Sequence, residues 1–67
     1  MPTVRDAIEL VHYDGWILVR TRGSHRIYIH RFKPGVVVIA GHPGKDLATG
    51  TWNSILKQAG LKKGQSK

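Results

Sequence analysis

The same spacing of apolar residues occurs near both ends of this chain, and it limits the structures that the middle of the chain can form. Apolar residues recur there at positions i, i+3, i+4 and i+7, namely Val4, Ala7, Ile8 and Val11, then Trp52, Ile55, Leu56 and Ala59. This spacing predicts two amphipathic helices, over residues 3–14 and 50–60. A helix with one apolar face buries that face against another element. The residues between the helices must therefore supply a surface that both can cover.

Residues that start and stop helices flank both segments. Thr3 is followed three residues later by Asp6, which is a short form of the capping box. Gly15 offers the left-handed position at which helices commonly end. For the second helix we expect Thr49 or Thr51 to provide the cap.

Three segments with the composition of strands lie between the helices. Residues 16–22 and 36–39 are rich in strand-forming residues, and residues 25–32 alternate between apolar and polar side chains. Gly23-Ser24 and Pro34-Gly35 separate them as tight turns. Short connections make successive strands antiparallel neighbours. The expected fold class is α+β: a helix, a three-stranded antiparallel sheet and a helix, with both helices on one face of the sheet.

The alternation in the second strand predicts which of its side chains face the helices. Ile27 and Ile29 are expected to point inward, which turns Arg26, Tyr28 and His30 outward. The predicted core is therefore Val4, Ile8, Val11, Ile27, Ile29, Val37, Ile39, Ile55 and Leu56, joined by Val19.

Length and composition exclude several classes of protein. At 67 residues the chain is one domain, 1–67, with a small core, and it is too short for a Rossmann domain, a barrel or a two-domain enzyme. It has no cysteine, so a thiol nucleophile and a disulfide framework are excluded. The longest apolar run, Val36 to Ala40, is too short to cross a bilayer, and no signal peptide is recognisable, so we expect a cytoplasmic location. Residues 62–67 form a basic tail that we expect to fray.

The charge is strongly positive and unevenly distributed. The net charge is +7, and no acidic residue lies between Gly15 and Lys45. The basic residues of this stretch are Arg20, Arg22, Arg26, Arg31, Lys33 and Lys45. Guanidinium groups bond phosphate oxygens in pairs, so the cluster favours a nucleic acid as partner over a merely solvated basic surface. A membrane surface is the weaker alternative, because neither helix has the basic polar face of an interfacial anchor.

Among the four histidines, His25 is the one best placed for chemistry. It follows the Gly23-Ser24 turn at the start of a strand, where a side chain can be exposed and still held in place. An imidazole titrates near neutral pH and suits proton transfer. His42, in the glycine-rich loop after the third strand, could approach it, whereas His12 suits the end of its helix and His30 could contact RNA or nothing. Metal ligands do not converge, so the chemistry that fits is histidine-assisted attack of an RNA 2′-OH on its own phosphate.

Several of these residues belong to longer motifs. They are Gly15-Trp16, Arg20, Gly23-Ser24-His25-Arg26-Ile27-Tyr28, His42, Lys45-Asp46-Leu47, Gly50-Thr51 and Ile55-Leu56-Lys57-Gln58-Ala59-Gly60-Leu61. Together they resemble the HicA toxins of bacterial type II toxin–antitoxin systems. The resemblance runs from the first helix to Leu61.

The resemblance implies a fold like the double-stranded-RNA-binding domain and the activity of a ribosome-independent mRNA interferase that a HicB antitoxin neutralises. The family's catalytic histidine falls on His25, and its second histidine falls on His42. Ala40 stands where the family usually has proline, which leaves the loop around His42 less rigid. No cofactor is implied. The residues expected to contact RNA are Arg20, Arg22, Gly23, Ser24, Arg26, Tyr28 and Lys45.

A second interpretation fits the same sequence features. The chain could be a non-catalytic RNA-binding module that has the same scaffold and the same basic surface. Such a module would bind RNA in a salt-dependent way and leave it intact.

Overall fold

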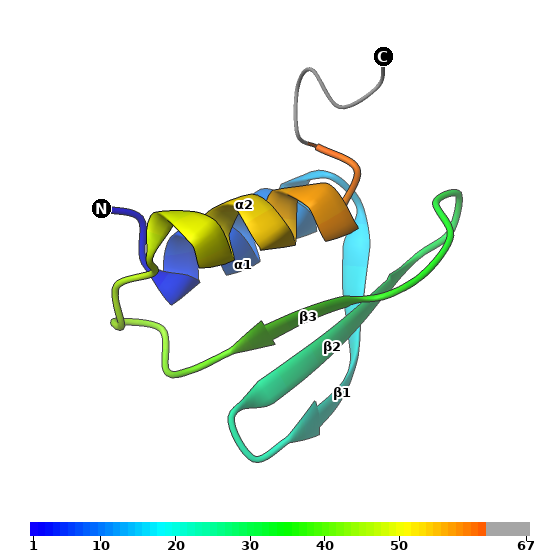
Figure 1. The fold of residues 1–67 in the computed structure, drawn as a ribbon. Coiled ribbons are helices and arrows are strands. Elements are labelled where there is room, and N and C mark those ends of the chain that lie inside the picture. The colour runs from blue at the N-terminus through cyan, green and yellow to red at the C-terminus, as the bar shows by residue number, and fades with distance from the viewer. Residues whose placement is uncertain (62–67) are drawn as a thin grey trace.

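A computed structural model describes residues 1–61; the tail predicted to fray, residues 62–67, lies outside the described residues. Both helices lie on the same side of a three-stranded antiparallel sheet, with strand order β1-β2-β3 (Figure 1). The elements are α1 (Val4–Tyr13), β1 (Trp16–Arg22), β2 (His25–His30), β3 (Val37–Ala40) and α2 (Thr49–Gln58). The predicted α+β fold class and the order of its elements are confirmed.

The second strand is shorter than the sequence predicts, and a side chain explains why. β2 ends at His30 rather than at residue 32. The backbone N–H groups of Phe32 and Lys33 donate to His30 Nδ1 at 3.0 and 3.2 Å. These two donors fold back onto the imidazole, so the chain turns at once and cannot continue the sheet.

The predicted start of α1 is confirmed atom by atom. The Asp6 N–H donates to the Thr3 hydroxyl at 3.2 Å, and the Thr3 N–H donates to Asp6 Oδ2 at 2.8 Å. A cap of this kind stabilises a helix by about 0.5–2 kcal/mol. The next two donors are also used, because the N–H groups of Val4 and Arg5 bond carbonyls of the loop that follows β3.

The predicted cap of α2 is wrong. Ala48 occupies the N-cap position, and no side chain caps this end. Thr49 already lies inside the helix, so its hydroxyl is one position too late to serve. The other end of α2 is tied to the sheet instead, since the Val38 N–H donates to Gln58 Oε1 at 3.1 Å.

The core is built from both helices and from the sheet face beneath them. Its buried members are Val4, Ala7, Val11, Trp16, Tyr28, Val37, Ile39, Leu47, Ile55 and Ala59. Five of these were predicted, and the predicted Ile8 packs against them partly buried. The sequence analysis missed the two largest, Trp16 and Tyr28, which are 1% and 3% exposed.

The predicted parity of β2 is wrong, and with it part of the predicted core. Tyr28 is buried, whereas Ile29 is 43% exposed and Ile27 is only half-buried. Val19 is also exposed. Since alternate residues of a strand share a face, Arg26, Tyr28 and His30 point toward the helices, and His25, Ile27 and Ile29 point away. The Tyr28 ring offers more apolar surface to a small core than an isoleucine does.

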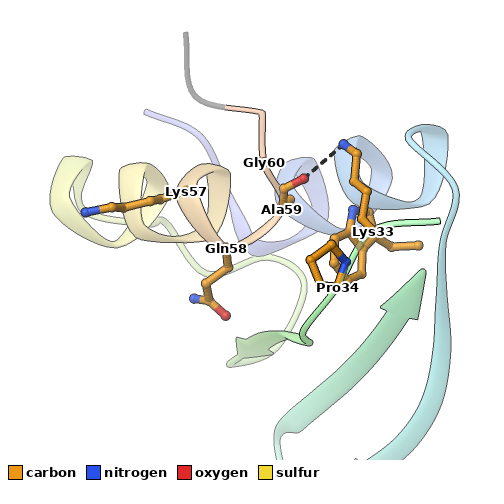
Figure 2. Close-up of a pocket in the computed structure, with 7 residues that line it drawn as sticks. Lys33, Pro34, Lys57, Gln58, Ala59 and Gly60 are labelled. Carbon is orange, nitrogen blue, oxygen red and sulfur yellow. Dashed lines mark hydrogen bonds between the residues drawn. The ribbon is translucent and has the colours of Figure 1, made fainter. Parts of the chain in front are cut away.

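A polar joint connects both helices to the sheet at one end of the molecule. The Lys33 ammonium lies 2.6 Å from Asp14 Oδ2 and donates to the Ala59 carbonyl at 3.1 Å, a contact seen in Figure 2. Trp16 Nε1 donates to the same carboxylate at 3.2 Å, and His30 Nε2 contacts the Asp14 carbonyl at 2.7 Å. Only the neutral imidazole with its proton on Nε2 can donate there while Nδ1 accepts from the backbone. His30 is therefore a structural residue.

Beside this joint lies an open hollow of about 360 Å³. Its lining residues are Trp16, Lys33, Pro34, Lys57, Gln58, Ala59 and Gly60, most of which Figure 2 labels. None of the residues predicted to act on RNA belongs to this set. The hollow marks the seam between the end of α2 and the β2–β3 connection.

Gly15 is the position at which this joint tolerates least change. Its φ is +101°, and a Cβ built there would lie 2.8 Å from His30 Nε2. We expect Gly15→Ala to lower the free energy of unfolding by about 1–3 kcal/mol, through backbone strain and through displacement of the imidazole. Urea unfolding followed by circular dichroism measures the loss.

Gly50→Ala is the matched control. Gly50 lies inside α2, and apart from its chain neighbours and the nearby backbone of its own helix no described atom comes within 4 Å of a Cβ built there. Alanine should leave stability unchanged or raise it by up to about 1 kcal/mol. Equal effects of the two substitutions would contradict the role assigned to Gly15.

Candidate functional site

His25 is the first residue of β2 and lies next to the turn of the β1–β2 hairpin. The hairpin turns through Gly23 and Ser24, since Arg22 pairs with His25 across the two strands. Gly23 has a φ of +58°, which fits the two-residue turn that places glycine first. The imidazole of His25 is exposed. A tight turn and a paired strand therefore hold a solvent-facing histidine in a defined place.

A β-bulge brings two arginines onto the face that His25 occupies. The pairing register shifts between Leu18 and Arg20, which leaves Val19 as the extra residue of β1. An extra residue reverses the alternation beyond it. Arg20 consequently pairs with Ile27, and Arg22 with His25, on the outer face of the sheet. Without the bulge both arginines would share the inner face with Trp16.

The rest of this outer face is apolar. Ile17 pairs with Ile29 across β1 and β2, and the two side chains are 51% and 43% exposed. They lie on the same face as Arg20, toward the opposite end of the strands. We name the set Ile17, Arg20, Arg22, His25 and Ile29 the outer face. Its apolar half was missed by the sequence analysis, which had assigned Ile29 to the core.

The loop after β3 reaches the same end of the sheet. The Gly41 N–H donates to the Ser24 carbonyl at 3.1 Å, and the Gly41 carbonyl accepts from Arg26 Nη1 at 2.7 Å. His42 follows directly. Lys45 closes a turn back onto it through a 3.0 Å bond from its N–H to the His42 carbonyl. The structure thus brings the backbone of His42 beside the turn that carries His25.

Lys45 also belongs to this end of the molecule. A Cβ built at Gly41 would lie 3.4 Å from Lys45 Cδ, so the lysine stem crosses the Gly41 backbone. The Lys45 side chain is exposed beyond that point. The predicted residues brought together are therefore Arg22, Gly23, Ser24 and His25, with Arg20 next along β1. His42 and Lys45 lie on the loop that bonds Ser24 through Gly41.

Two predicted contact residues take other positions. Tyr28 lies in the core, where burial raises the pKa of its phenol, an effect that the nearby Arg26 guanidinium opposes. Arg26 is half-buried on the inner face and is engaged with Gly41. Both placements follow from the inverted parity of β2. Neither side chain shares the outer face with His25.

Within residues 1–61, no cluster of three or more His, Asp or Glu side chains could hold a metal ion. In the same part of the chain, neither helix is long and apolar enough to cross a membrane.

The fold and this end of the sheet define a class of small basic α+β domains with an exposed histidine on the first hairpin. A family model described as the HicA toxin of bacterial toxin–antitoxin matches residues 4–61. The chain therefore belongs to the HicA toxin family, and it is the toxin type of a toxin–antitoxin pair. A search of curated proteins finds no match.

The burial of Tyr28 has a measurable consequence for titration. Its pKa is raised from the ordinary value of 10.0, so the unfolded chain loses this proton first as the pH rises. The contribution of the protonated Tyr28 phenol to the stability of the folded chain is complete below about pH 10. It is lost as the pH rises through the pKa that Tyr28 has in the folded state. In Tyr13→Phe, phenolate absorbance should therefore rise at higher pH than in Tyr28→Phe, where only the 93% exposed Tyr13 reports. Coincident titration curves would contradict the placement of Tyr28.

Proposed function

We propose that this HicA-family chain is an endoribonuclease that cleaves mRNA with His25 as its catalytic residue. The observation that supports this most is the cross-strand pair of Arg22 and His25, both exposed on the outer face at the hairpin end. Directly paired residues of antiparallel strands lie about 4.5–5.5 Å apart at Cα. An imidazole and a guanidinium at that separation can contact one phosphate and the ribose beside it.

The proposed reaction is a transesterification within the RNA. The ribose 2′-oxygen forms a bond to the adjacent phosphorus, and the bond from phosphorus to the 5′-oxygen breaks. The products are a 2′,3′-cyclic phosphate and a 5′-OH. His25 takes the proton of the 2′-OH or gives one to the leaving 5′-oxygen, and its exposed position leaves the ring accessible to either.

The arginines supply the electrostatic part of this mechanism. The pentacoordinate phosphorane carries more negative charge than the starting diester, so fixed positive groups stabilise it more than they stabilise the substrate. Arg22 is next to His25, and Arg20 follows along the same face. Apart from Gly23 itself and its two chain neighbours, no described residue has an atom within 4 Å of a Cβ built at Gly23, which allows the RNA backbone to approach the turn closely.

One histidine cannot act on both oxygens at the same moment. The second proton transfer needs another group or a water molecule. His42, on the loop bonded to Ser24 through Gly41, is the accessory candidate, and Lys45 adds a charge at the same end. We assign His42 a supporting role and His25 the principal one.

His25→Ala tests this proposal. Loss of a placed acid or base should lower RNA cleavage by roughly 10²- to 10⁴-fold. The fold should be kept, since the side chain is exposed and such substitutions usually change stability by less than about 0.5 kcal/mol. Cleavage of a labelled RNA by the purified protein, with identification of the cyclic phosphate, measures the effect.

His12→Ala provides the matched control, because His12 is an exposed histidine on α1. It should cleave at the rate of the unaltered chain. DNA of the same sequence should resist, because it lacks the 2′-OH. Wild-type cleavage by His25→Ala would overturn the mechanism, and binding without cleavage by the unaltered chain would favour the non-catalytic module.

We also propose that a HicB-type antitoxin covers the outer face. Membership of the HicA family implies a toxin–antitoxin partner in general. The outer face offers that partner apolar contacts at Ile17 and Ile29 and positive charge at Arg20 and Arg22. A covering surface that is acidic opposite the arginines would be electrostatically complementary and would also block His25.

Reversal of one charge tests the location of this interface. Arg20→Glu should weaken binding of a co-expressed HicB-type antitoxin by roughly tenfold or more, because it places like charges together. Arg5→Glu makes the same change at an exposed site on α1 and should leave the affinity unchanged. Titration calorimetry at one fixed salt concentration compares them. Equal losses would place the antitoxin elsewhere.

A further inference from the structure

We propose that Arg26 is a positioning residue, whose guanidinium holds the loop of residues 41–45 against the β1–β2 turn and thereby fixes the position of His42 and Lys45 relative to the turn that precedes His25. The idea rests on the proposed cleavage for its kinetic consequence. The clamp itself is a structural statement that can be tested without any activity.

The position of Arg26 separates it from the arginines of the outer face. It lies on the inner face of β2, and it is half-buried, whereas Arg20 and Arg22 are exposed. Its Nη1 donates to the Gly41 carbonyl over 2.7 Å. Bonds from a charged donor at this length are about twice as strong as neutral ones.

The hairpin bonds both backbone groups of Gly41. Its N–H donates to the Ser24 carbonyl at 3.1 Å, while its carbonyl accepts from Arg26. Gly41 has a φ of +102°, and a Cβ there would lie 3.4 Å from both Val4 Cγ2 and Lys45 Cδ. The backbone therefore passes through a narrow gap in a conformation that few other residues adopt, and Arg26 secures it there.

The far side of the loop is attached to α1 rather than to the sheet. The Val4 N–H donates to the Lys45 carbonyl at 2.8 Å, and the Arg5 N–H donates to the Pro43 carbonyl at 2.9 Å. These bonds are made by backbone groups, so no side chain can be removed to break them. Within residues 1–61, the side-chain hydrogen bond that joins this loop to the hairpin comes from Arg26. Its loss should let the loop move relative to His25.

A positioning role and a direct phosphate contact predict different kinetics. A phosphate ligand contributes to binding, so its loss raises KM and reduces the dependence of affinity on salt. A residue that places catalytic groups mainly affects kcat, and misplacement by about 1 Å can cost roughly 10²-fold. The same substitution at Arg26 and at Arg22 separates the two roles.

The experiment compares Arg26→Gln with Arg22→Gln, since each removes one positive charge from a strand of the same hairpin. Arg26→Gln should lower kcat on a labelled RNA by roughly 10- to 100-fold and leave KM within about twofold. It should also speed hydrogen exchange at the Gly41 amide by at least about tenfold. Arg22→Gln should raise KM and also lower kcat, because Arg22 is proposed to contact the phosphate of the substrate and of the phosphorane. It should reduce the slope of log affinity against log salt by about 0.7 and leave Gly41 exchange unchanged.

Arg26→Lys provides the rescue, because an ammonium can still donate one bond to the Gly41 carbonyl. It should restore slow Gly41 exchange and most of kcat, and it carries the test if Arg26→Gln does not fold. A raised KM and a reduced salt slope with unchanged Gly41 exchange, in either Arg26 variant, would overturn the proposal. If the unaltered protein cleaves no RNA, the proposed function fails, and the exchange measurement still decides on the clamp.

Discussion

Asp14 is the residue on which the arrangement of the whole molecule depends. Its carboxylate receives the Lys33 ammonium and the Trp16 indole N–H, and its carbonyl receives the His30 imidazole. Lys33 then continues the chain of bonds to the end of α2. In a chain of 67 residues, whose core is small, such a joint fixes the angle at which both helices meet the sheet.

The two faces of β2 carry different kinds of residues, packed and hydrogen-bonded ones on the inner face and the candidate site residue on the outer face. Arg26, Tyr28 and His30 face the helices, where they bond the loop, fill the core and complete the joint with Asp14. His25 points the other way. The bulge at Val19 then adds the arginines of β1 to the face of His25. The inner face of this six-residue strand packs against the helices and the loop, and its outer face carries His25.

Local patterns predicted the elements of this fold, and long-range contacts decided what they could not. The helices followed from the apolar spacing, and the α1 cap from Thr3 and Asp6. The predicted orientation of β2 was wrong because both of its faces look partly apolar in the sequence. The face that is buried is the one whose His30 contacts Asp14, 16 residues away in the chain. His25 was identified correctly as an exposed residue at a strand start, but the bulge that gives it Arg20 and Arg22 leaves no sequence signature.

The two edge strands of the sheet differ in what covers them, and the difference bears on self-association of the chain. The edge at β3 is bonded by Gln58, whereas β1 presents Ile17, Leu18 and Val19, each about half exposed, within residues 1–61. An apolar edge strand is a template for uncontrolled strand pairing. A protein that covers β1 would prevent such pairing. Where β1 is left uncovered, its unpaired backbone groups can pair with the same edge of another copy of the chain.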